Sequence, residues 1–251
     1  MGPLLLAIRR DPLPVNDCQP KTRHRMNTLV SPIPPEASAG TLHLTQILVP
    51  YEDAVRLLRI RDMYDWHQRV WQAFGGRANE KRNFLIRVDR KEEAFRVLIL
   101  SGTPPNKPDW CPTECFGTKL VPDDYFAHSR YRFSLLANPT KKLRVDNPDG
   151  SRKKNGRRVP LTQRDDLVNW FARKAEAGGF TIDTKSLRTI PRGREYFHKA
   201  GAHGTHTSVE FLGELIITDR RLFRVTVASG IGSAKAFGFG LLVIAPLSSI
   251  D

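Results

Sequence analysis

A tyrosine and a histidine stand three residues apart in the segment Tyr64-Asp-Trp-His67-Gln-Arg-Val-Trp71. Residues at this spacing lie on the same side of a helix, so the two rings are expected to be neighbours. Histidine titrates near neutral pH, and a well-placed acid or base accelerates a reaction by about 10²–10⁴-fold. The pair therefore indicates acid–base chemistry. The alternative is a histidine packed among apolar residues and hydrogen-bonded in the core.

A glycine-rich loop near the C-terminus is the second candidate site. Its residues of interest are Gly230, Gly232, Ser233, Lys235, Gly238 and Gly240. Glycine allows positive φ and the close approach of another molecule, because it has no Cβ. Backbone N–H groups exposed beside a lysine can bind phosphate oxygens. The alternative is a tight turn that leads into a buried strand, expected at 241–245.

The charge of the chain indicates a polyanionic partner. Forty Lys and Arg face 26 Asp and Glu, which gives a net charge of +14. Nucleic acid and an anionic membrane surface both fit this excess. We expect no membrane partner, because no apolar run approaches the roughly 18 residues that cross a bilayer. A basic amphipathic helix for the membrane surface is also missing, since the helix expected at 162–177 mixes both charges.

Two basic segments are candidate RNA contacts, one over residues 141–158 and one over residues 186–199. The first surrounds a turn signal at 147–150, so its alternative interpretation is a solvated loop. Phosphate binding is the interpretation that the net charge favours. The positions expected to contact RNA are Lys141, Lys142, Arg144, Arg188, Arg192, Arg194 and Lys199.

The three cysteines do not form a metal site or a disulfide framework. Cys111 and Cys115 are four residues apart, but no second cysteine pair lies near them. Structural zinc sites need four ligands, so we expect no metal and no cofactor. Free thiols in a reducing cytoplasm explain these residues better.

The pattern of strands and helices divides the chain into an extension and two similar halves. Residues 1–40 are rich in proline, with no periodicity, and are expected to be a disordered extension. Residues 41–127 predict strands at 41–49, 84–88, 94–100 and 116–121. Between the first two we expect a helix at 62–74 that Asp62 caps and Gly75 ends.

Residues 128–251 repeat this order. Strands are expected at 131–137, 180–187 and 241–245, with a long hairpin of 194–199 and 207–218. One helix is expected at 162–177, with Thr162 as its cap, and another follows Asp219. The predicted fold is α+β, with two tandem ferredoxin-like (RRM-like) domains whose antiparallel sheets carry helices on one face.

The two motifs together resemble the CasE (Cse3) family of CRISPR-associated endoribonucleases, which belong to the type I-E Cascade system. The loop reads Gly-Ile-Gly-x-x-Lys-Ala-Phe-Gly-x-Gly-Leu-Leu, and the helix carries the family's Tyr-x-x-His. The resemblance covers residues 41–246. It implies two ferredoxin-like domains and cleavage of CRISPR repeat (pre-crRNA) hairpins. It also implies that the crRNA stem-loop and other Cascade subunits are partners.

The resemblance also implies a metal-independent mechanism. The RNA 2′-OH would attack the adjacent phosphate, leaving a 2′,3′-cyclic phosphate and a 5′-OH. His67 would be the main general acid or base, and Tyr64 would orient or activate the 2′-OH. Some members carry a lysine five residues after the histidine, where this chain has Gln72, and Lys235 is a candidate replacement. The alternative function is a non-catalytic module that binds structured RNA.

Overall fold

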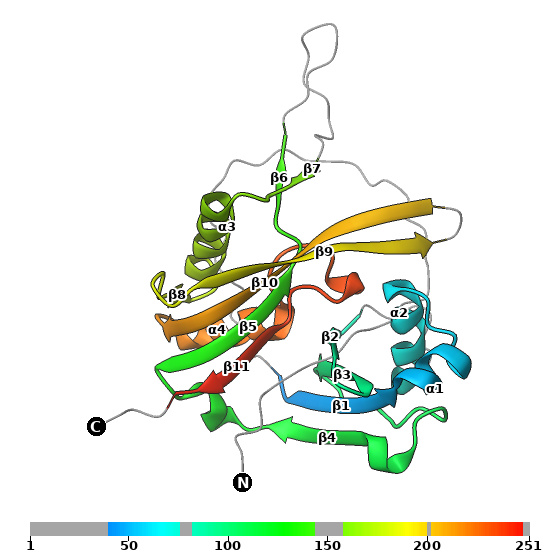
Figure 1. Cartoon of the computed structure of the whole chain (residues 1–251). Helices are drawn as coiled ribbons and strands as arrows, with labels where there is room; N and C mark the ends of the chain where they lie inside the picture. Colours follow the sequence, from blue (N-terminus) through cyan, green and yellow to red (C-terminus); the bar gives the residue numbers. More distant parts are fainter. Residues whose placement is uncertain (1–39, 76–81, 144–157, 200–201, 248–251) are drawn as a thin grey trace, which may run out of the picture.

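The computed structural model describes residues 40–75, 82–143, 158–199 and 202–247, and its strands form two larger sheets (Figure 1). The first sheet has the order β2-β3-β1-β4, and all of its neighbouring strands are antiparallel. Its strands are β1 (Leu42–Pro50), β2 (Phe84–Arg90), β3 (Ala94–Ser101) and β4 (Phe116–Val121). All four strands predicted for this half are confirmed.

The second sheet has the order β11-β5-β10-β8, and β9 also pairs with β10. Its strands are β5 (Arg130–Ala137), β8 (Phe180–Ile182), β9 (Arg188–Lys199), β10 (Ala202–Ile217) and β11 (Leu242–Pro246). A separate two-stranded ribbon joins β6 (Thr140–Lys142) to β7 (Arg158–Pro160). The predicted hairpin is confirmed, and its strands begin earlier in the chain than expected.

The helices are α1 (Tyr51–Arg56), α2 (Met63–Trp71), α3 (Arg164–Glu176) and α4 (Arg220–Ser229). Short 3₁₀ turns are η1 (Gln72–Phe74), η2 (Thr113–Cys115), η3 (Asp123–Phe126) and η4 (Lys235–Phe237). The predicted caps Asp62 and Asp219 accept hydrogen bonds from backbone N–H groups of α2 and α4. Gly75, at φ 73°, ends η1 as predicted.

Two local predictions were wrong, and one helix was missed. Thr162 does not cap α3, because Leu161 N–H still donates to Pro139 O and keeps the chain extended; Gln163 is the N-cap. The strand expected at 180–187 ends at Ile182, because the Asp183 carboxylate accepts from the next backbone N–H groups and makes a turn. Helix α1 was not expected in the segment 51–61.

The helices pack on one face of each sheet through aromatic side chains. In the first sheet, Trp71 of α2 meets Phe84 of β2 at a ring-centroid distance of 4.9 Å. In the second, Phe171 of α3 and Phe223 of α4 cover the same face, with centroids 5.0 Å from Phe211 and 5.7 Å from Tyr131. Side chains alternate along a strand, so the opposite face of each sheet carries the residues between these.

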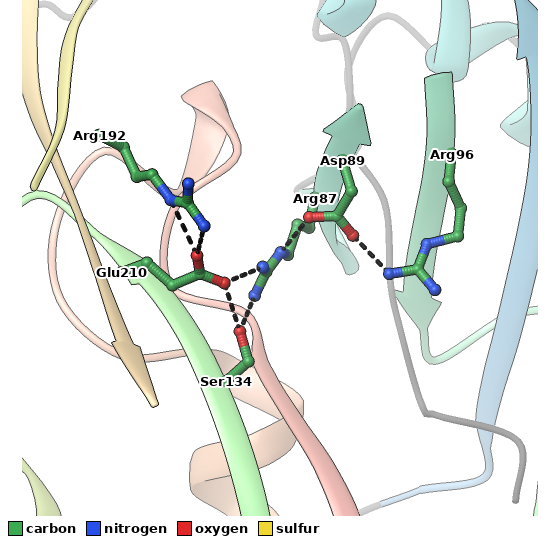
Figure 2. A network of polar contacts seen from close by, with 6 residues as sticks. All are labelled: Arg87, Asp89, Arg96, Ser134, Arg192 and Glu210. Carbon is green, nitrogen blue, oxygen red and sulfur yellow. Dashed lines mark hydrogen bonds and ion pairs between the residues drawn. The ribbon is translucent and has the colours of Figure 1, made fainter. Parts of the chain in front are cut away.

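A buried ion pair joins the two sheets (Figure 2). Arg87 on β2 donates from Nη2 to Glu210 Oε1 on β10 at 2.6 Å, and the two residues are only 7% and 6% exposed. Ser134 on β5 bridges them: it accepts from Arg87 Nη1 at 2.6 Å and donates to Glu210 Oε1 at 2.8 Å. Arg192 of β9 binds Oε2 from the other side, with Nε at 2.9 Å.

The same network continues into the first sheet. Asp89 accepts from Arg87 Nε at 2.7 Å and from Arg96 Nη2 at 2.8 Å. Burial acts to raise the pKa of Glu210, but the charge of Arg87 and hydrogen bonds from Arg192, Ser134 and Arg87 outweigh it, so the pKa lies below its usual value.

The buried side chains of both sheets belong to one contiguous cluster. The structure therefore does not separate two cores, and the division into 41–127 and 128–251 stays a prediction. The expectation of a disordered extension at 1–40 falls on residues that, except for Gly40, lie outside the described ones. Within the described ranges, no helix combines the length and apolar character needed to span a bilayer.

Replacing the central carboxylate tests the ion pair. Glu210→Gln should lower the free energy of unfolding at pH 7 by about 3–5 kcal/mol, because Arg87 stays buried without its counter-charge. The lowered pKa of Glu210 means that its contribution is complete above the ordinary carboxyl value of 4.5 and is lost below it. The two proteins should therefore converge in stability as the pH falls below that value, as measured by urea unfolding.

Glu214→Gln is the matched control, because Glu214 lies on the same strand and pairs with Arg130 at an exposed site. It should cost less than about 1 kcal/mol. Equal losses for the two variants would contradict the assigned role of the buried pair.

Candidate active site and RNA-binding surface

Helix α2 presents different side chains on different sides. Trp66 and Val70 are buried in the core and fix the helix against the first sheet. His67 is also buried, at 3% exposure, whereas Tyr64 is partly exposed. The Tyr64 and His67 ring centroids are 5.8 Å apart, so their expected proximity is confirmed.

The glycine-rich loop lies against α2 and covers the histidine. The Phe237 ring stands edge-on to the His67 ring, with centroids 6.3 Å apart. The same phenyl ring packs on Phe197 of β9 at 4.3 Å and on His206 of β10 at 4.9 Å. The structure thus brings together the two motifs that are 163 or more residues apart in the sequence. The position of Phe237 is a tertiary contact that no local sequence signal indicates.

The two ends of the loop are held tightly together. Ile231 N–H donates to Gly240 O at 2.7 Å, and Gly240 N–H donates to Leu136 O on β5 at 2.8 Å. A Cβ at Gly240 would lie 2.5 Å from Ile231 O, so only glycine fits this neck. Between the held ends, η4 is bracketed by left-handed residues, Ala234 at φ 59° and Gly238 at φ 80°.

Some of the backbone N–H groups that were expected to bind phosphate instead form hydrogen bonds within the chain. The N–H groups of Gly230 and Gly238 donate to Thr226 O at 2.8 Å and to Lys235 O at 3.4 Å. Over the described residues, the N–H groups of Gly232 and Ser233 have no acceptor. These two amides are among the donors that the loop can offer to an anion.

Lys235 lies on η4, next to α2, but its ammonium group turns back toward the loop. Nζ donates to Ser229 O at 2.7 Å. Burial, and then the nearby charges of Arg82 and Lys174, hold the pKa of Lys235 below its usual value. Lys235 lies near two other cations, so an anion bound there would stabilise its charged form.

A second contact ties the hairpin to the start of α2. Asp62 Oδ1 accepts from Tyr64 N–H at 2.7 Å and Asp65 N–H at 3.2 Å, which caps the helix. Its other oxygen, Oδ2, accepts from His198 N–H on β9 at 3.1 Å and lies 3.1 Å from His198 Nδ1. The sequence indicated the cap but not this link to the hairpin.

The basic residues of the hairpin have different surroundings. Arg188 and Arg194 are exposed on β9, and Arg194 has no hydrogen-bonding partner within the described part of the chain. Arg192 is instead bound to Glu210, so its guanidinium already has a counter-charge. Lys199 ends β9, and its side chain lies outside the described ones.

The first basic segment lies apart from α2. Lys141 and Lys142 are exposed on β6, and Lys141 Nζ is 3.5 Å from Asp166 of α3. In Figure 1 this ribbon stands on the α3 side of the second sheet, away from α2. Arg144 lies outside the described residues. Across the described ranges, no group of three or more His, Cys, Asp or Glu side chains could hold a metal ion.

Comparison with known proteins defines the class of this chain. Residues 42–246 match the family model described as "CRISPR associated protein". The Cascade subunit CasE of Escherichia coli K12 is 32% identical over 192 residues, which are 74% of this chain and 94% of that protein. The CRISPR-associated endoribonuclease Cse3 of Thermus thermophilus is 29% identical over 73% and 90% of the two chains.

Solved structures agree with this class. Cas6e of Escherichia coli K-12 superposes with a TM-score of 0.61 at 27% identity, over 82% of this chain and all of that one. Thermus thermophilus Cse3, bound to an RNA representing a pre-cleavage complex, gives 0.63 at 27% identity over the same shares. The chain belongs to the CasE (Cse3) family of CRISPR-associated proteins.

Shortening the covering side chain should expose the histidine. In Phe237→Ala, diethyl pyrocarbonate should modify the His67 imidazole several-fold faster than in the parent protein, because the ring that packs on it is gone. Mass spectrometry of the modified peptides measures the rate, with His43 of β1 as the internal control. Phe237→Leu should stay close to the parent. An unchanged rate at His67 in Phe237→Ala would show that another element covers it.

Proposed function

We propose that this chain is a metal-independent endoribonuclease that cuts CRISPR repeat (pre-crRNA) hairpins. The observation that carries the proposal is the meeting of Tyr64 and His67 with the glycine-rich loop at one place in a member of the CasE (Cse3) family. A relative carries the name endoribonuclease, and structural neighbours are bound to RNA. The net charge of +14 fits the same substrate.

The fold that we assign to this function is a pair of ferredoxin-like domains. Both sheets follow one plan, in which the first strand of the half lies between its last strand and its third. The second half has the full β-α-β-β-α-β order in β5, α3, β8, β10, α4 and β11, with β9 as one additional strand. The first half has only the turn η2 between β3 and β4, where the second has α4.

The chemistry needs only groups that the chain and its RNA supply. The 2′-OH beside the scissile phosphate loses its proton and attacks phosphorus, while the 5′-oxygen leaves and gains a proton. The products are a 2′,3′-cyclic phosphate and a 5′-OH. We assign the main proton transfer to the His67 imidazole and the orientation or activation of the 2′-OH to the Tyr64 hydroxyl.

Access to His67 requires the loop to move. A side chain that is 3% exposed cannot contact a phosphate, so Phe237 must leave the His67 ring when RNA binds. The neck at Ile231 and Gly240 stays fixed by its hydrogen bonds, and the residues between them swing out. The Gly232 and Ser233 amides then face the RNA backbone, and Lys235 can leave Ser229 O for a phosphoryl oxygen.

Lys235 is therefore our candidate for the charge-stabilising role. Gln72, at the position where some family members carry a lysine, is exposed and neutral. Arg69 is held at Leu58 O on another side of α2. We further propose that the protein works in the cytoplasm and keeps the crRNA stem-loop as a subunit of Cascade, as the name of the Escherichia coli relative suggests.

Removing the imidazole tests the mechanism. His67→Ala should bind repeat RNA nearly as well as the parent but cut it about 10²–10⁴-fold more slowly, because the histidine contributes where a proton moves. Tyr64→Phe should cost less, since the ring still packs and only its hydroxyl is lost. Single-turnover cleavage of repeat RNA measures both.

The same assay also tests whether the 2′-OH is the nucleophile and whether cleavage needs a metal ion. EDTA should leave cleavage intact, and replacing the attacking 2′-OH by hydrogen should stop cleavage without abolishing binding. Cleavage of the 2′-deoxy RNA, or loss of activity in EDTA, would rule out the mechanism. A fully active His67→Ala protein would leave the pair as helix packing, and an inactive parent that binds the hairpin would favour the non-catalytic RNA-binding module.

The hairpin β9–β10 should contact RNA through Arg194. Arg194→Ala should weaken binding of the repeat hairpin and lower the salt dependence of the affinity by about one ion, because one phosphate contact is lost. Lys119→Ala, an exposed cation on β4, is the control that should change neither quantity. Arg192 is a poorer probe, since its loss also disturbs Glu210. An unchanged salt slope in Arg194→Ala would place the RNA elsewhere.

A further inference from the structure

A positively charged pocket of about 420 Å³ borders α2, the helix that carries Tyr64 and His67. It is formed by the α1–α2 connection and the helix, and it is lined by Leu58, Arg59, Arg61, Asp65, Gln68, Arg69 and Gln72. Three guanidinium groups face a single carboxylate there, with two side-chain amides. A pocket of this composition suits a polyanion that also carries hydrogen-bonding groups, rather than an apolar ligand.

Internal contacts hold the pocket's shape. Arg69 Nη2 donates to Leu58 O at 3.0 Å, and this ties the connecting loop to the helix. Arg61 donates to Asp65 from its backbone at 2.8 Å and from its guanidinium at 2.9 and 3.0 Å. Two of the three arginines are therefore engaged in building the site.

Arg59 is different from the other two. Its side chain is exposed and has no hydrogen-bond or ion-pair partner among the described residues. Its backbone has φ 52°, and Ala234 of the glycine-rich loop is the other non-glycine residue with positive φ in the described part of the chain. A residue with a long side chain rarely adopts this conformation, and such residues are often found at functional sites. The two strained residues lie in the two loops that flank α2.

The pocket and the Tyr64/His67 pair share one surface of α2. Tyr64, Gln68 and Gln72 follow each other at four-residue intervals, so they form one stripe along the helix. His67 lies on one side of this stripe, and Asp65 lies on the other. A strand of RNA that leaves the pair over Tyr64 and Gln68 would reach the pocket within about 10 Å, which is one helix diameter.

We propose that this arginine pocket, defined by Arg59, Arg61, Arg69 and the two glutamines, binds the single-stranded RNA that adjoins the cut. Arg59 contacts a phosphate, and the exposed Gln72 amide faces a base edge. The hairpin stem would then lie on the second sheet, and the single strand would cross α2. This rests on the proposed endoribonuclease function and adds to it a subsite for the flanking strand.

The test measures what a single-stranded flank adds to binding. The repeat hairpin is made with a 2′-deoxy nucleotide that blocks cleavage, in three forms: without flanks, with an upstream flank and with a downstream flank. The parent should bind one flanked form more tightly than the bare hairpin. Arg59→Asn should reduce that gain by about tenfold and lower the salt slope of the gain by about one ion. Asparagine tolerates positive φ, so the substitution removes the charge without adding strain.

Two variants serve as controls. Arg59→Lys keeps the charge and should retain part of the gain, and Arg221→Asn removes a comparably exposed arginine from α4 and should retain all of it. A gain that Arg59→Asn leaves unchanged, or no gain in the parent, overturns the inference. The inference is also overturned if Arg59→Asn leaves RNA binding unchanged and lowers only the amount of the protein recovered in reconstituted Cascade. That result would show that the pocket binds an acidic protein surface. A parent that fails to bind even the bare hairpin would refute the proposed function itself.

Discussion

The relative placement of the two sheets depends on the buried ion pair between Arg87 and Glu210. Removing two charges from water costs several kcal/mol for each, and the cost is recovered only if every donor and acceptor is satisfied. Here each Glu210 carboxylate oxygen accepts a hydrogen bond from an arginine. Ser134 accepts from Arg87 and donates to Glu210, and Asp89 accepts from the Nε of Arg87. Hydrogen bonds are directional, so this network favours the observed placement of the sheets in addition to their apolar contacts. The pair therefore acts as a positional constraint more than as a source of stability.

The candidate active site exists only because that constraint is met. His67 comes from the first sheet's helix, and Phe237, Phe197 and His206 come from the second sheet's loop and hairpin. The contact of Asp62 with His198 supplies a second fixed point near the start of α2. With both points held, the loop and the helix face each other without a covalent connection nearby. A site assembled in this way is sensitive to changes that lie far from its chemistry.

The sequence predicted what is local and missed what depends on distant partners. Alternation located the strands of the first sheet. The Asp62 and Asp219 carboxylates cap the starts of their helices, and Gly75 ends η1 because it lacks a Cβ and can adopt positive φ. The Arg87–Glu210 and Asp62–His198 contacts join residues 123 and 136 positions apart, and no periodicity indicates them. The pairing of Arg192 with Glu210 was missed for the same reason, because a charge in a sequence does not reveal its counter-charge; the RNA contact expected of Arg192 stays a prediction. The Tyr64/His67 pair was found because its members are helix neighbours.

In the mechanism that we propose, the glycine-rich loop explains how a buried histidine could take part in catalysis. Its neck is closed by Ile231 and Gly240 and anchored on Leu136, so strand β11 is not disturbed when the loop moves. Within the neck, Ala234 and Gly238 sit in left-handed conformations at the two ends of a three-residue turn. Rotation at such positions redirects Phe237 with little change elsewhere, and the Ala234 strain of order 1 kcal/mol favours departure from the closed state. In this proposed mechanism, the movement that uncovers the imidazole also turns Lys235 and loop amides outward, so exposure of the proposed acid–base group and formation of the anion site are one event.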